Sequence, residues 1–304
     1  MMSMLRSLIL VSFLFLAVVS SSAGQPSSDP DGRCRALFSH LVVPILAVKE
    51  PSFGNVTAEG SDGCLFANVT AQMGPTFLSI DAVNVDHAVL SPENLPMPEA
   101  LRMSVTGINF GVRNNPVYNY IMKSTNTAPS LLVDYSYDEK TKALNLTSFS
   151  LEWGRGTLNA SGAVLGFAPT RSDALPGIAA FMLSLKSFKL ALSDPDSSIQ
   201  RPVMMSVGLH LLEGSADPAA KDAELRKQAA AWLGANLPRF NISSDSISAT
   251  IAAMQAFPKA GKPLDIEINP PKPIGLPDLA TVVSGAKAGR DILPDGAVKV
   301  TYGN

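Results

Sequence analysis

Apolar and polar residues alternate over much of the stretch from residue 131 to residue 164, and no other feature constrains the fold of this chain so tightly. The alternation from Leu131 to Tyr137 has the period of two that is typical of a half-buried β-strand. Polar residues at 138–142, and then the glycines Gly154 and Gly156, mark two turns that each lead into a further alternating segment. Short strands joined by tight turns pair as antiparallel hairpins, so the pattern predicts a meander.

One short pattern, a small residue followed by an apolar, a polar and an apolar residue, recurs along the chain. Its copies are Ala82–Val85, Gly107–Phe110, Ser148–Leu151 and Ser187–Leu190. Their spacing is irregular, which excludes a solenoid repeat of fixed period. The recurrence indicates a long, repeatedly folded sheet with one apolar face.

Helical spacing of apolar residues is found on both sides of this β region. The apolar run from Cys34 to Val48 predicts a helix that Pro44 kinks or ends. After residue 196 the sequence predicts two helices, a strand, a third helix and a last strand, in that order. They lie at 217–236, 247–254, 264–268, 277–286 and 297–302.

The predicted fold class is therefore α+β: a long twisted antiparallel sheet, built as a meander, with three to four helices packed on it. An N-terminal helix and the antiparallel β region occupy residues 34–195. The helix-rich region at 196–304 is expected to complete the same domain.

The N-terminus has the features of an export signal. Arg6 precedes twelve apolar-dominated residues, Leu8–Val19, whereas a membrane-spanning helix needs about twenty. Ser21 and Ala23 are small residues that favour cleavage after residue 23, and residues 24–33 then form a flexible leader. An uncleaved N-terminal anchor is the alternative. No later apolar run reaches spanning length, so we expect a soluble periplasmic or secreted protein.

Two cysteines, Cys34 and Cys64, lie near the mature N-terminus. An exported chain with this even, minimal count predicts one disulfide, and two buried free thiols are the alternative. Closing a loop of about thirty residues would stabilise the fold by roughly 3–4 kcal/mol in the chain-entropy model.

The charge balance restricts the class of partner. Without Arg6 the mature chain has 23 Lys and Arg against 26 Asp and Glu, a net charge of about −3. This argues against nucleic acid, which requires a basic surface. Charged residues are only 16% of the chain, below the usual quarter. Such a chain has either a large dry core or an apolar groove.

Catalytic motifs are missing from the sequence. His40, His87 and His210 lie in three distant segments, and no metal-binding, nucleophile-elbow or phosphate-loop motif occurs, so neither a metal nor a cofactor is expected. Two weak catalytic candidates remain. One is His87 with its neighbours Asp81 and Asp86. The other is a set of acidic residues near the first hairpin, namely Asp134, Asp138, Glu139 and Glu152.

Soft apolar side chains form the best candidate binding surface. Flexible thioethers and aromatic rings can repack around acyl chains, although the same residues also fill ordinary cores. The candidate ligand-binding residues are Met182, Phe188, Met204, Met205, Met254 and Phe257.

Five Asn-x-Ser/Thr triplets begin at Asn55, Asn68, Asn145, Asn159 and Asn241. In a eukaryotic secretory route they could be glycosylated, whereas a bacterial export pathway would ignore them.

Three segments, Val133–Tyr137, Ala143–Leu146 and Ile266–Pro273, carry a resemblance to known proteins. The region from about residue 131 to the C-terminus resembles uncharacterised periplasmic proteins of alphaproteobacteria. More loosely, it is similar to the β-groove segments of AsmA-like and TULIP-type lipid-transfer proteins. The resemblance implies a curved sheet with helices laid on it that shelters lipid. It carries over no binding residue and leaves residues 34–110 unassigned.

The sequence thus predicts an exported, non-enzymatic protein that binds or shuttles an apolar, lipid-like ligand in the cell envelope. A hydrolase with an unfamiliar site is one alternative. An envelope structural or interaction module that pairs with a protein partner through its sheet edges is the other.

Overall fold

A computed structural model describes residues 32–38, 49–60, 63–73, 76–89, 98–112, 128–167, 183–200, 211–212, 215–257 and 261–303. The predicted signal peptide and residues 24–31 of the predicted leader lie outside these ranges. The described residues up to 112 belong to one compact unit, unit 1, and those from 128 onward to a second, unit 2. The helix-rich C-terminal region therefore shares a unit with the hairpins that begin at residue 130.

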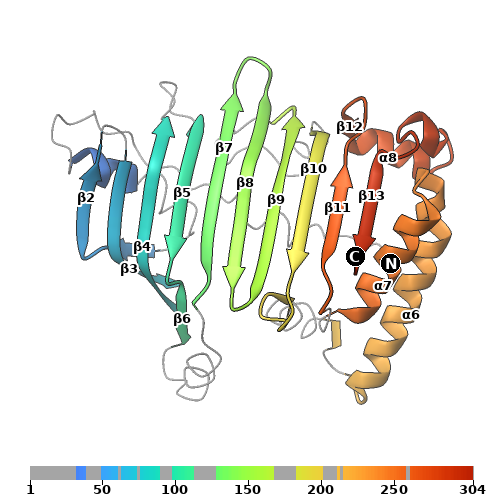
Figure 1. Ribbon diagram of the computed structural model, residues 1–304, viewed down its shortest axis with the longest axis horizontal. Coiled ribbons are helices and arrows are strands. Elements are labelled where there is room, and N and C mark those ends of the chain that lie inside the picture. Colours follow the sequence, from blue (N-terminus) through green and yellow to red (C-terminus); the bar gives the residue numbers. More distant parts are fainter. Residues whose placement is uncertain are drawn as a thin grey trace. The chain divides into compact units, whose positions relative to one another are not determined.

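Unit 1 is an antiparallel sheet. Its strands are β1 (Lys49–Ser52), β2 (Asn55–Glu59), β3 (Gly63–Met73), β4 (Thr76–Val89), β5 (Ala100–Thr106) and β6 (Asn109–Val112). The long strands β3 and β4 pair at the centre, β1 and β2 both pair with the other edge of β3, and β5 and β6 both pair with β4 (Figure 1).

One face of the unit 1 sheet is a closed apolar core. The register places Cys64, Val85 and Met103 in one row across β3, β4 and β5. The next row holds Phe66, Val83 and Val105, and all six of these residues are at most 5% exposed. Burial of this kind contributes about 1.5–3 kcal/mol for each large apolar side chain.

A short helix at residues 32–38 adds to this core. It begins within the predicted leader, whose last two residues, Gly32 and Arg33, form its first turn, and residues 39–48 of the longer expected helix are outside the described ranges. The Phe38 ring packs against Phe53 and Phe66, with centroids 4.8 and 5.0 Å apart.

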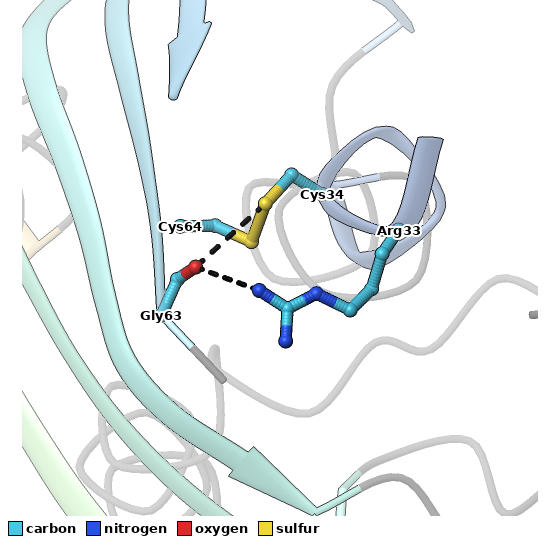
Figure 2. Close-up of a disulfide and its surroundings, with 4 residues drawn as sticks. All are labelled: Arg33, Cys34, Gly63 and Cys64. Carbon is cyan, nitrogen blue, oxygen red and sulfur yellow. Dashed lines mark hydrogen bonds between the residues drawn. A yellow bond between two sulfur atoms is a disulfide. The ribbon is translucent and has the colours of Figure 1, made fainter. Parts of the chain in front are cut away.

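A disulfide ties this helix to β3 (Figure 2). The sulfur atoms of Cys34 and Cys64 are 1.97 Å apart, and both residues are fully buried. Arg33 donates a hydrogen bond from Nη2 to the carbonyl oxygen of Gly63, at 3.1 Å, beside the same junction. The predicted pairing of the two cysteines is confirmed.

Unit 2 contains the predicted meander. Its strands β7 (Ser130–Asp138), β8 (Ala143–Trp153), β9 (Gly156–Leu165), β10 (Ser184–Ser193), β11 (Leu264–Ile268) and β13 (Val298–Tyr302) pair antiparallel in that order (Figure 1). The two-residue strand β12 (Ile274–Gly275) pairs with the start of β10. An α+β fold built on antiparallel meander strands, as expected, is confirmed.

The first helix of unit 2 begins at its predicted N-cap, and the second begins three residues before the expected segment at 247–254. The helix α6 (Pro218–Asn236) has Asp217 as its N-cap, which accepts a hydrogen bond from the backbone N–H of Ala220 at 3.0 Å. Ser243 caps α7 (Ser244–Ala256) in the same way. The 3₁₀ turn η1 (Leu237–Phe240), the helix α8 (Leu276–Val283) and the 3₁₀ turn η2 (Gly289–Asp291) complete the unit.

The helix α7 closes the last edge of the sheet. It packs beside β13, and α6 packs on α7 (Figure 1). The backbone N–H of Val300, on the unpaired side of β13, donates a hydrogen bond to the Oγ atom of Ser246 at 3.1 Å, and Ser246 is buried. A sheet edge with free N–H groups would pair with further strands, so this contact ends the sheet at β13.

Candidate functional site

The candidate site is one face of the unit 2 sheet. In paired antiparallel strands, residues opposite each other point to the same side. The register therefore assembles rows such as Val133, Phe149, Ala160, Leu190, Ile266 and Val300 across all six strands. We call this set of side chains the apolar face. Its members are Leu131, Val133, Tyr135, Tyr137, Leu144, Leu146, Phe149, Leu151, Leu158, Ala160, Gly162, Val164, Leu185, Phe188, Leu190, Leu192, Leu264, Ile266, Ile268, Val298, Val300 and Tyr302.

The apolar face is only half-buried. Apart from Tyr137 and Val300, which are 5% and 9% exposed, all its residues keep an intermediate exposure. The matching face of unit 1 is closed, with Phe66 and Val85 at 0%. The two sheets thus present similar apolar rows, but those of unit 2 still contact solvent.

Two bulges keep the apolar face continuous. The register shifts in β8 between Leu146 and Phe149, and in β10 between Leu185 and Ser187. A bulge inserts one extra residue, which restores the side on which the following residues point. Without these insertions, Leu146 and Phe149 would point to opposite sides of the sheet.

The strand β9 contributes the smallest side chains of the apolar face. Ala160 and Gly162 lie between Phe149 on β8 and the large residues Phe188 and Leu190 on β10. A Cβ atom at Gly162 would lie 2.5 Å from the carbonyl oxygen of Ser187, so glycine is required for the close approach of β9 and β10. The side chains at the centre of the apolar face therefore project less far from the sheet than those on its two flanks.

The ionisable residues of the apolar face are the three tyrosines Tyr135, Tyr137 and Tyr302. Burial raises the pKa of the Tyr135 phenol above its usual range, because the charged form would lose its hydration. Tyr135 thus stays neutral at physiological pH, and no charge arises there.

The opposite face of the sheet is polar. It holds an open cavity of about 610 Å³ lined by Ser148, Asn159, Lys189, Glu267 and Lys299, among others. Lys189 and Glu267, opposite each other on β10 and β11, form an ion pair with Nζ and Oε1 3.0 Å apart. Both side chains are largely exposed, so this pair contributes little to stability.

The predicted ligand-binding residues fall in different places. Phe188 lies on the apolar face. Met254 and Phe257 lie at the C-terminal end of α7, where their carbonyl oxygens accept hydrogen bonds from Arg226 of α6. Met182, Met204 and Met205 are outside the described residues. The apolar face itself was not predicted residue by residue, although strand period applied to each strand would have found most of it.

His87 lies opposite Arg102, where β4 pairs with β5. His87 is exposed on β4. Its neighbour Asp86 forms an ion pair with Arg102 at 3.4 Å and accepts a hydrogen bond from Asn84 at 2.7 Å. His40 and His210 lie outside the described residues.

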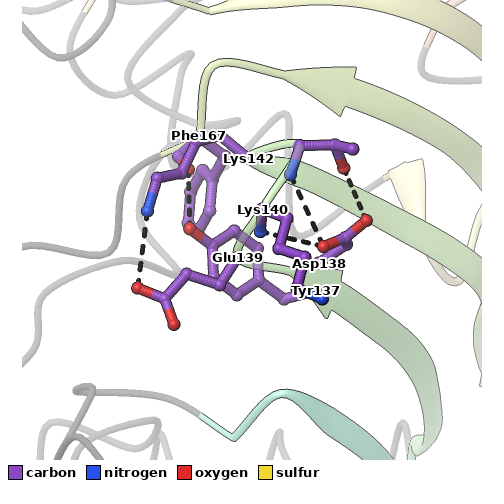
Figure 3. Close-up of polar contacts among 7 residues, drawn as sticks. Tyr137, Asp138, Glu139, Lys140, Lys142 and Phe167 are labelled. Carbon is purple, nitrogen blue, oxygen red and sulfur yellow. Dashed lines mark hydrogen bonds and ion pairs between the residues drawn. The ribbon is translucent and has the colours of Figure 1, made fainter.

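The acidic residues of the first hairpin stabilise its turn (Figure 3). Asp138 accepts hydrogen bonds from the Thr141 hydroxyl at 2.8 Å and the Lys140 backbone N–H at 2.9 Å. These two bonds hold the pKa of Asp138 below its usual value. Glu139 pairs with Lys142 at 3.5 Å, and the Tyr137 hydroxyl donates to the carbonyl oxygen of Phe167 at 3.1 Å.

The other two acids of that set lie elsewhere in the register. Asp134 is opposite Ser148, and Glu152 is opposite Ser130 at the far end of the hairpin. The structure therefore does not gather the four carboxylates into an acid–base pair.

A buried carboxylate that the sequence did not reveal lies after β10. Asp194 is 1% exposed and accepts hydrogen bonds from the backbone N–H groups of Ile199 and Gln200, at 3.2 and 2.7 Å. Nearby, the Ser198 hydroxyl holds the pKa of Asp196 below its usual value. These bonds order the loop that leaves the sheet.

Within the described parts of the chain, no group of three or more His, Cys, Asp or Glu side chains is placed to hold a metal ion. The described helices also include none that is long and apolar enough to cross a membrane.

Comparison of the chain with models of known protein families finds no match, and comparison with curated proteins finds none either.

Proposed function

We propose that this chain is exported to the periplasm or beyond the cell surface, where it binds or shuttles an apolar, lipid-like ligand on the apolar face of unit 2. The half-buried state of that face carries the proposal. A face that served only as core would be closed as it is in unit 1, where Phe66 and Val85 have no exposure.

The dimensions of the apolar face suit an acyl chain. Six strands about 4.8 Å apart give a width of about 24 Å. Each methylene removed from water contributes about 0.8 kcal/mol. Ten buried methylenes would thus contribute about 8 kcal/mol before the entropic costs of binding are subtracted. Micromolar affinity is reachable only if those costs are small.

The export signal and the disulfide support the proposed location. The signal at residues 1–23 predicts secretion, and a disulfide such as Cys34–Cys64 persists in oxidising compartments. A carrier working between membranes would need a face that can accept and release an apolar chain without unfolding.

A matched pair of variants on β10 tests the site. Leu190 is on the apolar face, and the next residue, Ala191, is on the polar face; both residues are among those that line the cavity of about 610 Å³. The polar amide of Leu190→Gln would lie in the path of the ligand, so the affinity for a fluorescent fatty acid should fall about tenfold or more, as expected for losing a well-packed leucine contact. Ala191→Gln should leave the affinity within about twofold.

The measurement is a fluorescence titration of the purified, folded variants, with far-UV circular dichroism as the check on folding. Failure of the wild-type protein to bind the fatty acid would contradict the proposal. Equal affinities of the wild type and Leu190→Gln for the fatty acid would show that it does not bind on the apolar face.

A further inference from the structure

The helix α8 exposes an apolar stripe that the core does not explain. Leu276 and Val283 are 42% and 62% exposed, and Val283 is the most exposed large apolar side chain among the described residues. With exposed Ala280 they follow the spacing i, i+4, i+7, so they share one side of the helix. The adjacent side of the helix is already buried through Val282 and Leu279.

A positively charged cavity of about 570 Å³ adjoins this stripe. Val283 lines it together with Arg239, Lys287 and Arg290. No Asp or Glu is among its lining residues, and none of the three cations forms an ion pair with any residue that the structure describes. The cavity therefore has an apolar side and a cationic side.

Close packing of two distant segments brings these cations together. Arg239 lies on η1, and Arg290 lies on η2, about fifty positions later in the chain. A Cβ atom at Gly289 would lie 2.0 Å from the carbonyl oxygen of Arg239, so only glycine permits η2 to pack this closely on η1.

Three carboxylates lie on the segments around the cavity but do not line it, and one of them, Asp295, is bonded to the lining residue Asn241. Asp278 accepts a hydrogen bond from the N–H of Gly275 at 3.0 Å, and Asp295 accepts one from Asn241 at 2.9 Å. Asp291 is exposed but does not line the cavity. These bonds leave the carboxylates charged, so the excess of positive charge is confined to the cavity lining, which holds Arg239, Lys287 and Arg290 and no acid, whereas the whole chain has a net charge of −2.

We propose that this surface, formed by Leu276, Val283, Arg239, Lys287 and Arg290, docks unit 2 onto an anionic lipid membrane. The charge complementarity is local: three cations face lipid phosphates while Val283 and Leu276 enter the boundary with the acyl chains. Because the net charge of the chain is negative, attraction to such a membrane requires a local group of cations, and this surface provides one. The inference goes beyond ligand binding and does not depend on it.

Vesicle co-sedimentation tests the docking surface. The purified protein is mixed with vesicles of phosphatidylcholine alone, or of phosphatidylcholine with one third phosphatidylglycerol. We expect binding to the anionic vesicles only, and weaker binding as salt increases. The charge-reversing pair Lys287→Glu and Arg290→Glu should lower the partition coefficient at least about tenfold. Val283→Ser should lower it a few-fold.

A control with matched charge is provided by Lys140→Glu with Lys227→Glu, two exposed lysines that do not line the cavity. This double variant should retain wild-type binding within about twofold. An equal loss in both double variants would show a general charge effect and overturn the proposal, as would equal binding to both kinds of vesicle.

Two further arms separate this proposal from others. Inorganic phosphate at constant ionic strength should not displace the protein from anionic vesicles, and displacement would mean that the cavity takes a free phosphate instead. Leu190→Gln should still sediment with the vesicles, because its change lies on the apolar face. If Leu190→Gln loses fatty-acid binding but still sediments with the vesicles, failure of the apolar face is distinguished from failure of the docking surface.

Discussion

The contrast between the closed core of unit 1 and the half-buried apolar face of unit 2 can be measured with one substitution made twice. Phe66 is fully buried, and its ring lies 5.0 Å from Phe38 and 5.8 Å from Phe53. Phe66→Ala should therefore lower the free energy of unfolding by about 3–5 kcal/mol, the sum of the lost transfer free energy and the cost of the cavity left behind. Phe149 on the apolar face keeps solvent contact. Phe149→Ala should cost only about 1–2 kcal/mol, because less area is removed from water there.

Urea unfolding provides the assay. With a slope of about 2 kcal/mol per molar urea, the two losses correspond to midpoint shifts of roughly 2 M and less than 1 M. Far-UV circular dichroism follows both sheets. Tryptophan fluorescence follows unit 2, which contains both tryptophans, Trp153 and Trp232. If Phe149→Ala destabilised unit 2 as much as Phe66→Ala destabilises unit 1, the apolar face would be an ordinary core and the reasoning would fail.

Two further stability predictions concern the ties that hold each unit. Replacing Cys34 and Cys64 together with alanine should lower the free energy of unfolding by about 3–4 kcal/mol, as expected for a closed loop of 30 residues, and urea unfolding followed by circular dichroism measures it. A loss below about 1 kcal/mol would mean that the disulfide does not constrain unit 1. Ser246→Ala should cost about 1–3 kcal/mol and speed hydrogen exchange at Val300, because that edge N–H loses its acceptor. Ser248→Ala, on an exposed position of the same helix, should change neither, and an equal effect of both would refute the edge-capping role.

Local sequence signals were enough to place most of the helices and strands of unit 2. The alternation from Leu131 predicts β7, Gly154 adopts the positive φ of 63° that its turn requires, and Asp217 caps α6. The strand β12 was beyond prediction, because two residues are too short to show any period.

The candidate site was predicted less well than the fold. Of the candidate residues, Phe188 lies on the apolar face, whereas Met254 lies on α7 and Phe257 is the C-cap of that helix. Which side chains share a face depends on register and on the bulges in β8 and β10, and both are set by strand partners far along the chain. Tertiary pairing of this kind leaves no trace in the residues of one strand.

Native mass spectrometry of the protein purified from its source tests the central claim most directly. The proposed function predicts a species heavier than the mature chain by the mass of one lipid-like molecule, which is released under mild activation and is lost in Leu190→Gln. A mass equal to that of the mature chain alone, together with no uptake of added fatty acid, would contradict ligand binding on the apolar face.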